Sequence, residues 1–92
     1  MIGSIKHRGL GRAHGRGDFR GVHATHANRI AAILSDLDAA SAVSDLDLPT
    51  YRLHRLKGSL EGLWSIRVSR KWRIVFRFED GDAHNVDLVD YH

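Results

Sequence analysis

The spacing of hydrophobic residues changes character near the middle of the chain. From Thr25 to Asp38 the apolar residues recur every three or four positions, as on one face of an amphipathic helix. Thr25 can cap the amino end of this helix through its hydroxyl group. We therefore predict a helix whose packing face consists of Ile30, Ile33, Leu34 and Leu37.

Beyond residue 50 the period becomes two, which predicts strands. We expect strands at residues 51–56, 63–69, 72–79 and 83–89, and a short one at 2–6. The E-D-G-D segment at residues 79–82 is a strong signal for a tight turn between the last two strands. In the clearest strand, Arg73 and Arg77 lie on one face, and the other face carries Trp72, Ile74, Phe76 and Phe78.

The register between strands 63–69 and 72–79 follows from their apolar sets, because a slip of one residue would invert every side chain. Placing Val68 opposite Trp72 matches the two sets and leaves residues 69–71 as a hairpin loop. The same register sets Arg67 directly opposite Arg73, where like charges repel unless an anion lies between them. We predict a sheet with a core on one face and a basic, anion-binding surface on the other.

Residues 8–21 contain five glycines and an arginine at every fourth position, namely Arg8, Arg12, Arg16 and Arg20. On a helix these arginines would form one stripe of like charge that repels itself until an anion lies along it. Each glycine inside a helix costs about 1 kcal/mol relative to alanine, so a helix here is weak in isolation.

Composition limits the remaining alternatives. With 92 residues, 42% of them hydrophobic and 27% charged, the chain has the composition of one globular domain spanning residues 1–92. It has no cysteine, which excludes disulfides and thiolate metal sites. No apolar run is long enough to cross a bilayer, so we expect a cytoplasmic protein without a membrane partner. The net charge of +3 favours an anionic partner.

Two segments carry side chains that could move protons. His54 lies between Arg52 and Arg55, whose charges favour the neutral imidazole that a general base requires. A single histidine in a strand is nevertheless more often structural. The sequence closes on Asp90, Tyr91 and His92, and pairing of the last strand beside residues 72–79 would bring them near Arg73. Such a set suits metal-independent transesterification of RNA, and neither a metal nor another cofactor is expected.

Several motifs resemble the HigB-type toxins of the RelE/ParE superfamily of bacterial toxin–antitoxin modules. They are I-K-H-R-G-L at residues 5–10, R-L-H-R-L-K-G at 52–58, G-L-W-S-I-R-V at 62–68, W-R-I-V-F-R-F-E-D-G-D-A at 72–83 and the closing D-Y-H. The resemblance implies a RelE-like, microbial-ribonuclease-like α+β fold, with two N-terminal helices packed on a mostly antiparallel sheet. It also implies an endonuclease that cleaves mRNA in the A site of the 70S ribosome and so inhibits translation. The implied partner is a helix-turn-helix, HigA-like antitoxin, through which alone the toxin would contact operator DNA.

The resemblance also assigns residues. By motif, the catalytic set of the family falls on His54, Asp90, Tyr91 and His92. Lys57 and Arg73 match basic positions near the scissile phosphate, and Lys71 stands where the family usually has an asparagine that contacts the codon. Together with Arg67 and Arg77 of the basic sheet surface, these form the predicted RNA-binding set.

The chain departs from the family pattern after His54, where Arg55 replaces a proline that would restrict the preceding residue. Two alternatives to the nuclease remain open at this stage. One is a non-enzymatic toxin that blocks a protein target, as ParE-type relatives block DNA gyrase. The other is an inactive copy that acts only as a transcriptional regulator bound to its antitoxin.

Overall fold

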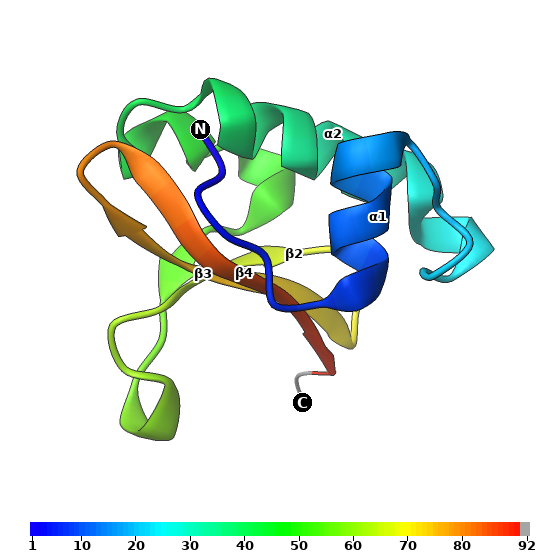
Figure 1. Ribbon diagram of the computed structural model, residues 1–92. Helices are drawn as coiled ribbons and strands as arrows, with labels where there is room; N and C mark the ends of the chain where they lie inside the picture. Colours follow the sequence, from blue (N-terminus) through cyan, green and yellow to red (C-terminus); the bar gives the residue numbers. More distant parts are fainter. Residues whose placement is uncertain (91–92) are drawn as a thin grey trace.

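A computed structural model describes residues 1–90, which form two helices on one side of a four-stranded sheet (Figure 1). The strands are antiparallel in the order β1-β2-β3-β4, in agreement with the mostly antiparallel sheet that the family resemblance implies. The elements are α1 (Arg8–Arg16), α2 (Ala27–Ala39), β1 (His54–Arg55), β2 (Trp64–Arg67), β3 (Trp72–Glu79) and β4 (Asp82–Asp90). Short 3-10 turns at Ala24–His26, Val43–Leu46, Pro49–Tyr51 and Gly58–Leu60 join them.

The core lies between the helices and the sheet. The predicted packing face of α2 is buried, and Leu10 and Ala13 of α1 extend it. The sheet contributes buried side chains from its three long strands, among them Ile66, Ile74, Phe76 and Val86. Burial of this apolar surface is the main driving force for the fold.

The first part of the glycine-rich segment forms the regular helix α1, and both ends of this helix are capped. The His7 imidazole caps α1 by accepting a hydrogen bond from the Leu10 amide at 3.1 Å. Gly17, in the left-handed conformation at φ 65°, closes the carboxyl end. Gly9 lies so close to Gly21 that a Cβ on Gly9 would overlap with the Gly21 carbonyl oxygen. The close crossing of helix and following loop therefore requires glycine.

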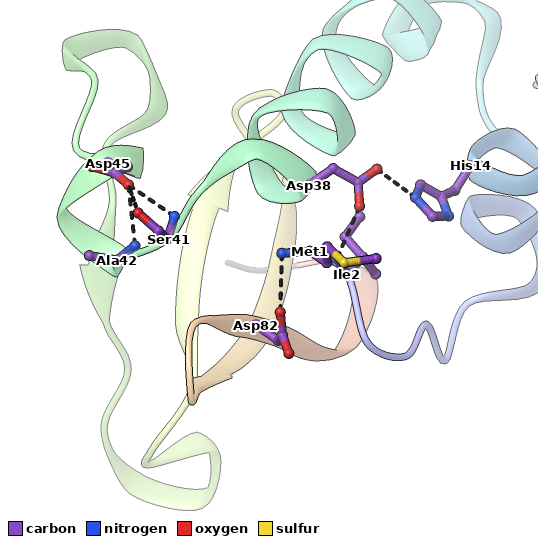
Figure 2. A network of polar contacts seen from close by, with 8 residues as sticks. All are labelled: Met1, Ile2, His14, Asp38, Ser41, Ala42, Asp45 and Asp82. Atoms are coloured by element: carbon purple, nitrogen blue, oxygen red, sulfur yellow. Dashed lines mark hydrogen bonds and ion pairs between the residues drawn. The ribbon is translucent and has the colours of Figure 1, made fainter.

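The N-terminal segment is bound to β4 and α2 rather than forming a regular strand. Ile2 and Ile5 make isolated parallel bridges to Ala83 and Val86 of β4. Figure 2 shows the polar contacts around them, in which the Ile2 amide donates to Asp38 at the end of α2 at 3.0 Å. The segment thus covers the outer edge of β4, which would otherwise be open to pairing with another chain.

The predicted register of β2 and β3 is confirmed. Ile66 lies opposite Ile74, and Arg67 lies opposite Arg73. The predicted tight turn after β3 is formed by Asp80 and Gly81, both with positive φ. Strand β4 also contains a bulge, in which Asn85 and Val86 together face the single residue Phe76 of β3.

The largest differences from the prediction concern β1 and the start of α2, whereas β2 and β4 differ from their predicted bounds by one or two residues. The strand expected at 51–56 is only His54–Arg55, because Pro49–Tyr51 forms a 3-10 turn and Arg52 adopts the left-handed conformation at φ 47°. Thr25 does not cap α2, which begins at Ala27 after a 3-10 turn. The Thr25 amide instead donates to the His23 ring.

Candidate functional site

The face of the sheet turned away from the helices carries four of the predicted site residues, namely His54, Arg67, Arg73 and Arg77, and we call it the basic face. One row of paired residues crosses all four strands and consists of His54, Ser65, Val75 and Asp87. A second row, two residues further along, consists of Arg67, Arg73 and Val89. Side chains of paired residues point to the same side of a sheet, so His54 shares this face with the two arginines.

His54 is exposed, and its contacts define which ring nitrogen is available. Its Nδ1 atom lies 3.2 Å from the carbonyl oxygen of Arg52 and 3.5 Å from the hydroxyl of Ser65. A carbonyl can only accept, so Nδ1 carries the proton in this contact. The lone pair of a neutral His54 is then on Nε2, where it can accept a proton from a substrate.

The backbone that leads into β1 is held by a polar network that sequence reasoning missed. The guanidinium of Arg29 on α2 donates to the carbonyl oxygens of Thr50 and Arg67, and it lies 5.0 Å from the centre of the Tyr51 ring. The Tyr51 hydroxyl donates to Asp36 of the same helix. Burial, and after it the hydrogen bond to Asp36, raises the pKa of Tyr51 to about 12. These contacts hold Thr50 and Tyr51, which lie four and three residues before His54.

The cations of the basic face differ in their surroundings. Arg67 and Arg73 are half-buried, and one Nη atom of Arg73 donates to the Ser69 carbonyl oxygen at 2.7 Å. This contact directs that Nη atom of Arg73 toward the β2–β3 loop. Arg77 is exposed and forms an ion pair with Glu79 at 3.1 Å.

The two predicted lysines lie in exposed loops. Lys57 directly follows the β1 region and precedes the 3-10 turn Gly58–Leu60. Lys71 is the last residue of the hairpin loop before β3. Both ammonium groups can therefore reach a ligand without the cost of leaving a buried position.

The end of β4 lies across the sheet from His54. Asp90 is exposed and is paired with Trp72, whose ring packs against the core, so the alternation of the strand directs Asp90 to the helix side. Three strand spacings of about 4.8 Å separate β1 from β4. Because Asp90 also lies three residues beyond Asp87, the backbones of His54 and Asp90 are on the order of 17 Å apart.

Of the predicted catalytic groups, His54 and Asp90 belong to one sheet, with Arg67 and Arg73 between its two edges, but the two residues are not in contact. Tyr91 and His92 lie outside the described residues. Among residues 1–90, no three histidine or acidic side chains come together in a way that could hold a metal ion. Within the same residues, no helix is long and apolar enough to span a membrane.

A small hollow of about 160 Å³ on the basic face was not predicted. Its apolar side chains come from the loop before β2 and from β3 and β4, and polar groups of Lys6, Asn85 and Asp87 line it as well. One signal was present in the sequence, since Val75 interrupts the run of charged residues on the outer side of β3. The basic face is therefore not flat, and the hollow lies beside its arginines.

The chain matches the family model described as the RelE-like toxin of the type II toxin–antitoxin system HigB, over residues 3–92. It is 44% identical to Endoribonuclease HigB of Proteus vulgaris over 92 residues, which cover all of both chains. It is also 44% identical to Toxin HigB-1 of Vibrio cholerae over 62 residues, or 66% of this chain and 65% of that one.

Solved structures agree with the fold. The crystal structure of a histidine-to-glutamine mutant of YafQ from E. coli superposes with a TM-score of 0.62 at 17% identity, covering 98% of this chain and 93% of that one. A second YafQ structure gives a TM-score of 0.55 at 15% identity over the same shares of the two chains. At such identities the similarity concerns the fold alone. Together with the match over nearly the whole sequence, these findings show that the chain belongs to the HigB family of RelE-like toxins of type II toxin–antitoxin systems.

Proposed function

We propose that this HigB-type endoribonuclease cleaves mRNA in the A site of the 70S ribosome, by metal-independent transesterification, and thereby inhibits translation. The observation that carries the proposal is the exposed His54 on the same sheet face as Arg67 and Arg73. The relative from Proteus vulgaris, which is 44% identical over the whole chain, bears the name of an endoribonuclease.

In the proposed reaction, Nε2 of His54 removes the proton from a ribose 2′-hydroxyl group. The freed oxygen attacks the adjacent phosphorus, and the bond from phosphorus to the 5′-oxygen breaks. The products are a 2′,3′-cyclic phosphate and a 5′-hydroxyl end. The contact between Nδ1 of His54 and the Arg52 carbonyl oxygen supports the role of base, because it leaves Nε2 free of a proton.

Cations and an acid complete the chemistry. To Arg67 and Arg73, which share this face, we assign the stabilisation of the negative charge that grows on the phosphorane oxygens. We assign protonation of the leaving 5′-oxygen to the Tyr91 and His92 pair, with Asp90 orienting the imidazole. A metal-dependent nuclease would instead need a cluster of carboxylates around the scissile phosphate. The middle of the basic face carries the arginine pair Arg67 and Arg73 rather than such a cluster.

We infer the path of the RNA from the separation of His54 from the end of β4. A backbone that crosses the sheet over the two arginines would pass both edges, with Lys57 and Lys71 on the adjoining loops and Arg77 further along β3. Holding a flexible strand in this position is costly for a small open surface. We therefore assign much of the orientation to the ribosome, which can supply several kcal/mol in this way.

Membership of a type II module implies a cognate antitoxin. We propose that it is a helix-turn-helix protein of the HigA type, that the toxin reaches operator DNA only through it, and that the toxin acts in the cytoplasm.

Induced expression of the chain in a bacterium, followed by primer extension on cellular mRNA, tests the proposal. We expect growth arrest with discrete breaks in translated mRNA, and loss of both in the His54→Gln variant. The matched control His23→Gln changes an exposed histidine far from the site in sequence and should leave both intact. Growth arrest with intact mRNA and damaged DNA would contradict the proposal and favour a toxin that blocks a protein target.

A further inference from the structure

Helix α1 carries a second basic surface on the helix side of the sheet, away from the basic face. Arg8, Arg12 and Arg16 are all exposed and recur every fourth residue, so they form one stripe along the helix. At 1.5 Å of rise per residue, neighbouring guanidinium attachment points are about 6 Å apart along the axis. We call these three residues the α1 stripe. Arg20, the fourth member of the sequence pattern, lies beyond the helix.

The α1 stripe borders a shallow groove. Gly11 and Gly15 lie beside the arginines, and a Cβ added to either glycine would meet no atom within 4 Å. The groove has a volume of about 590 Å³, and His7 and Ile5 line it together with the stripe and the two glycines. The glycines therefore leave the helix backbone open to close approach along the full length of the stripe.

The charge of the α1 stripe is largely uncompensated within residues 1–90. Helix α1 contains no acidic residue, and none of the three arginines forms a side-chain hydrogen bond or ion pair with a described residue. Asp18, the acid that follows the helix, is held by two hydrogen bonds from the Arg20 side chain, both at 3.0 Å, and Arg12 attracts it only weakly. Three like charges on one helix face destabilise the helix slightly, and an anion along the stripe would remove this cost.

We propose that the α1 stripe binds the phosphate backbone of structured RNA, separately from the strand that is cleaved. Arginine is suited to this role because its planar fork can donate two hydrogen bonds to one phosphate. A row of regularly spaced cations matches a nucleic-acid strand, in which phosphate charges follow one another at regular short intervals. Because Gly11 and Gly15 have no side chains, such a strand can lie close to the helix backbone in the groove.

A protein partner fits this surface less well. Protein interfaces depend on well-packed anchors at their centre, where arginine is common but is accompanied by buried apolar or aromatic side chains. Apart from Ile5, the groove is lined by arginine, glycine and histidine. The surface therefore offers an acidic protein helix charge but little hydrophobic contact.

The inference rests on the proposed function only for the natural source of the RNA, which would be ribosomal RNA beside the A site. The binding itself can be measured without cleavage. A fluorescein-labelled RNA hairpin made entirely of 2′-O-methyl nucleotides keeps its phosphates but cannot undergo transesterification. The test variant is R8Q/R12Q/R16Q, and the control R20Q/R55Q/R70Q removes the same charge from exposed positions elsewhere.

We expect fluorescence anisotropy over a series of KCl concentrations to show at least a tenfold greater loss of affinity for the test variant than for the control. The slope of log K against log[KCl] is negative, and its magnitude should decrease by about two to three for the test variant, since each lost phosphate contact accounts for about 0.7–0.9. The variant G11E/G15E, which introduces acids into the groove, should weaken binding in the same way. Circular dichroism verifies that each variant is folded.

Equal affinities and salt slopes for the test and control variants would overturn the inference. So would unchanged RNA binding by the test variant together with lost binding of the antitoxin, which would assign the α1 stripe to a protein. Absence of mRNA cleavage by the wild type, combined with stripe-dependent hairpin binding, would refute the proposed function and leave this inference standing.

Discussion

The Arg29 side chain of α2 donates two hydrogen bonds to the main-chain carbonyl oxygen of Arg67 in β2, at 3.1 Å from Nε and 2.7 Å from Nη2. It donates a further one to the Thr50 carbonyl oxygen. One guanidinium thus ties the helix layer to the strand that carries the basic face and to the segment before His54.

The first prediction concerns this fork. Arg29→Lys keeps the charge but cannot reach both carbonyl groups with the same geometry. We expect the free energy of unfolding to fall by about 1–3 kcal/mol, because hydrogen bonds from a charged group to partly buried carbonyls are lost. Urea denaturation measures the effect. Arg20→Lys, which alters an exposed ion pair, should leave stability nearly unchanged, and an equally small effect at Arg29 would show that the fork is dispensable.

The second prediction uses the raised pKa of Tyr51. Its value of about 12 lies above the ordinary tyrosine value of about 10, so the folded state favours the protonated phenol. The stabilisation is fully present below about pH 10 and is lost as pH rises through about 12. Urea midpoints of the wild type should therefore fall as pH rises above about 10, and this part of the fall should vanish in Tyr51→Phe. Parallel curves for the two proteins would contradict the assignment.

The third prediction separates two glycines of α1. Gly9→Ala should destabilise the protein by about 1–3 kcal/mol, because the new Cβ would collide with the Gly21 carbonyl oxygen. Gly11→Ala meets open space and should stabilise it by about 0.5–1 kcal/mol through helix propensity. Thermal unfolding monitored by circular dichroism compares them. Changes of the same sign in both variants would show that the crossing of α1 and its following loop is looser than described.

The fourth prediction concerns acid stability at the N-terminal segment (Figure 2). Burial raises the pKa of Asp38, but hydrogen bonds from the Ile2 amide and from His14 outweigh it, and the net pKa is lowered. A lowered pKa means stability that is present above the unfolded value of about 3.9 and is lost as pH falls below it.

Asp38→Asn should therefore reduce stability at neutral pH and make it less dependent on pH in the acid range. Asp47→Asn, at an exposed site in a neighbouring loop, serves as the control. Acid unfolding curves followed by tryptophan fluorescence compare the three proteins. The same acid profile in Asp38→Asn and wild type would exclude a role for this carboxylate.

Two parts of the fold, the packing face of α2 and the pairing of β2 with β3, could be predicted from local sequence patterns. The α2 packing face and the β2–β3 register follow from side-chain periodicity, because only one alignment buries both apolar sets. The short β1 could not be predicted, since the left-handed backbone of Arg52 depends on tertiary contacts rather than on a local signal. The Arg29 network joins residues 21 and 38 positions apart, and no spacing rule indicates such a pair.

For the site, the sequence indicated which residue types could act but not the distances between them. The shared face of His54, Arg67 and Arg73 follows once the strands are paired. The assignment of Lys57 and Lys71 came from motif resemblance. Both lysines lie in exposed loops, so the sequence pattern does not determine where their ammonium groups lie relative to a substrate. The roles of Asp90, Tyr91 and His92 stay predictions.

We propose that the residues at the end of the sequence act together with His54 on RNA held by the ribosome. The most direct test of this proposal is cleavage of mRNA bound to purified 70S ribosomes, by the wild type and by a variant that lacks only His92, with primer extension as the readout. The account predicts discrete A-site cuts by the wild type, loss of cutting in the shortened chain, and slow cutting of the same RNA without ribosomes. Undiminished cleavage after removal of His92, or equally fast cleavage of free RNA, would contradict it.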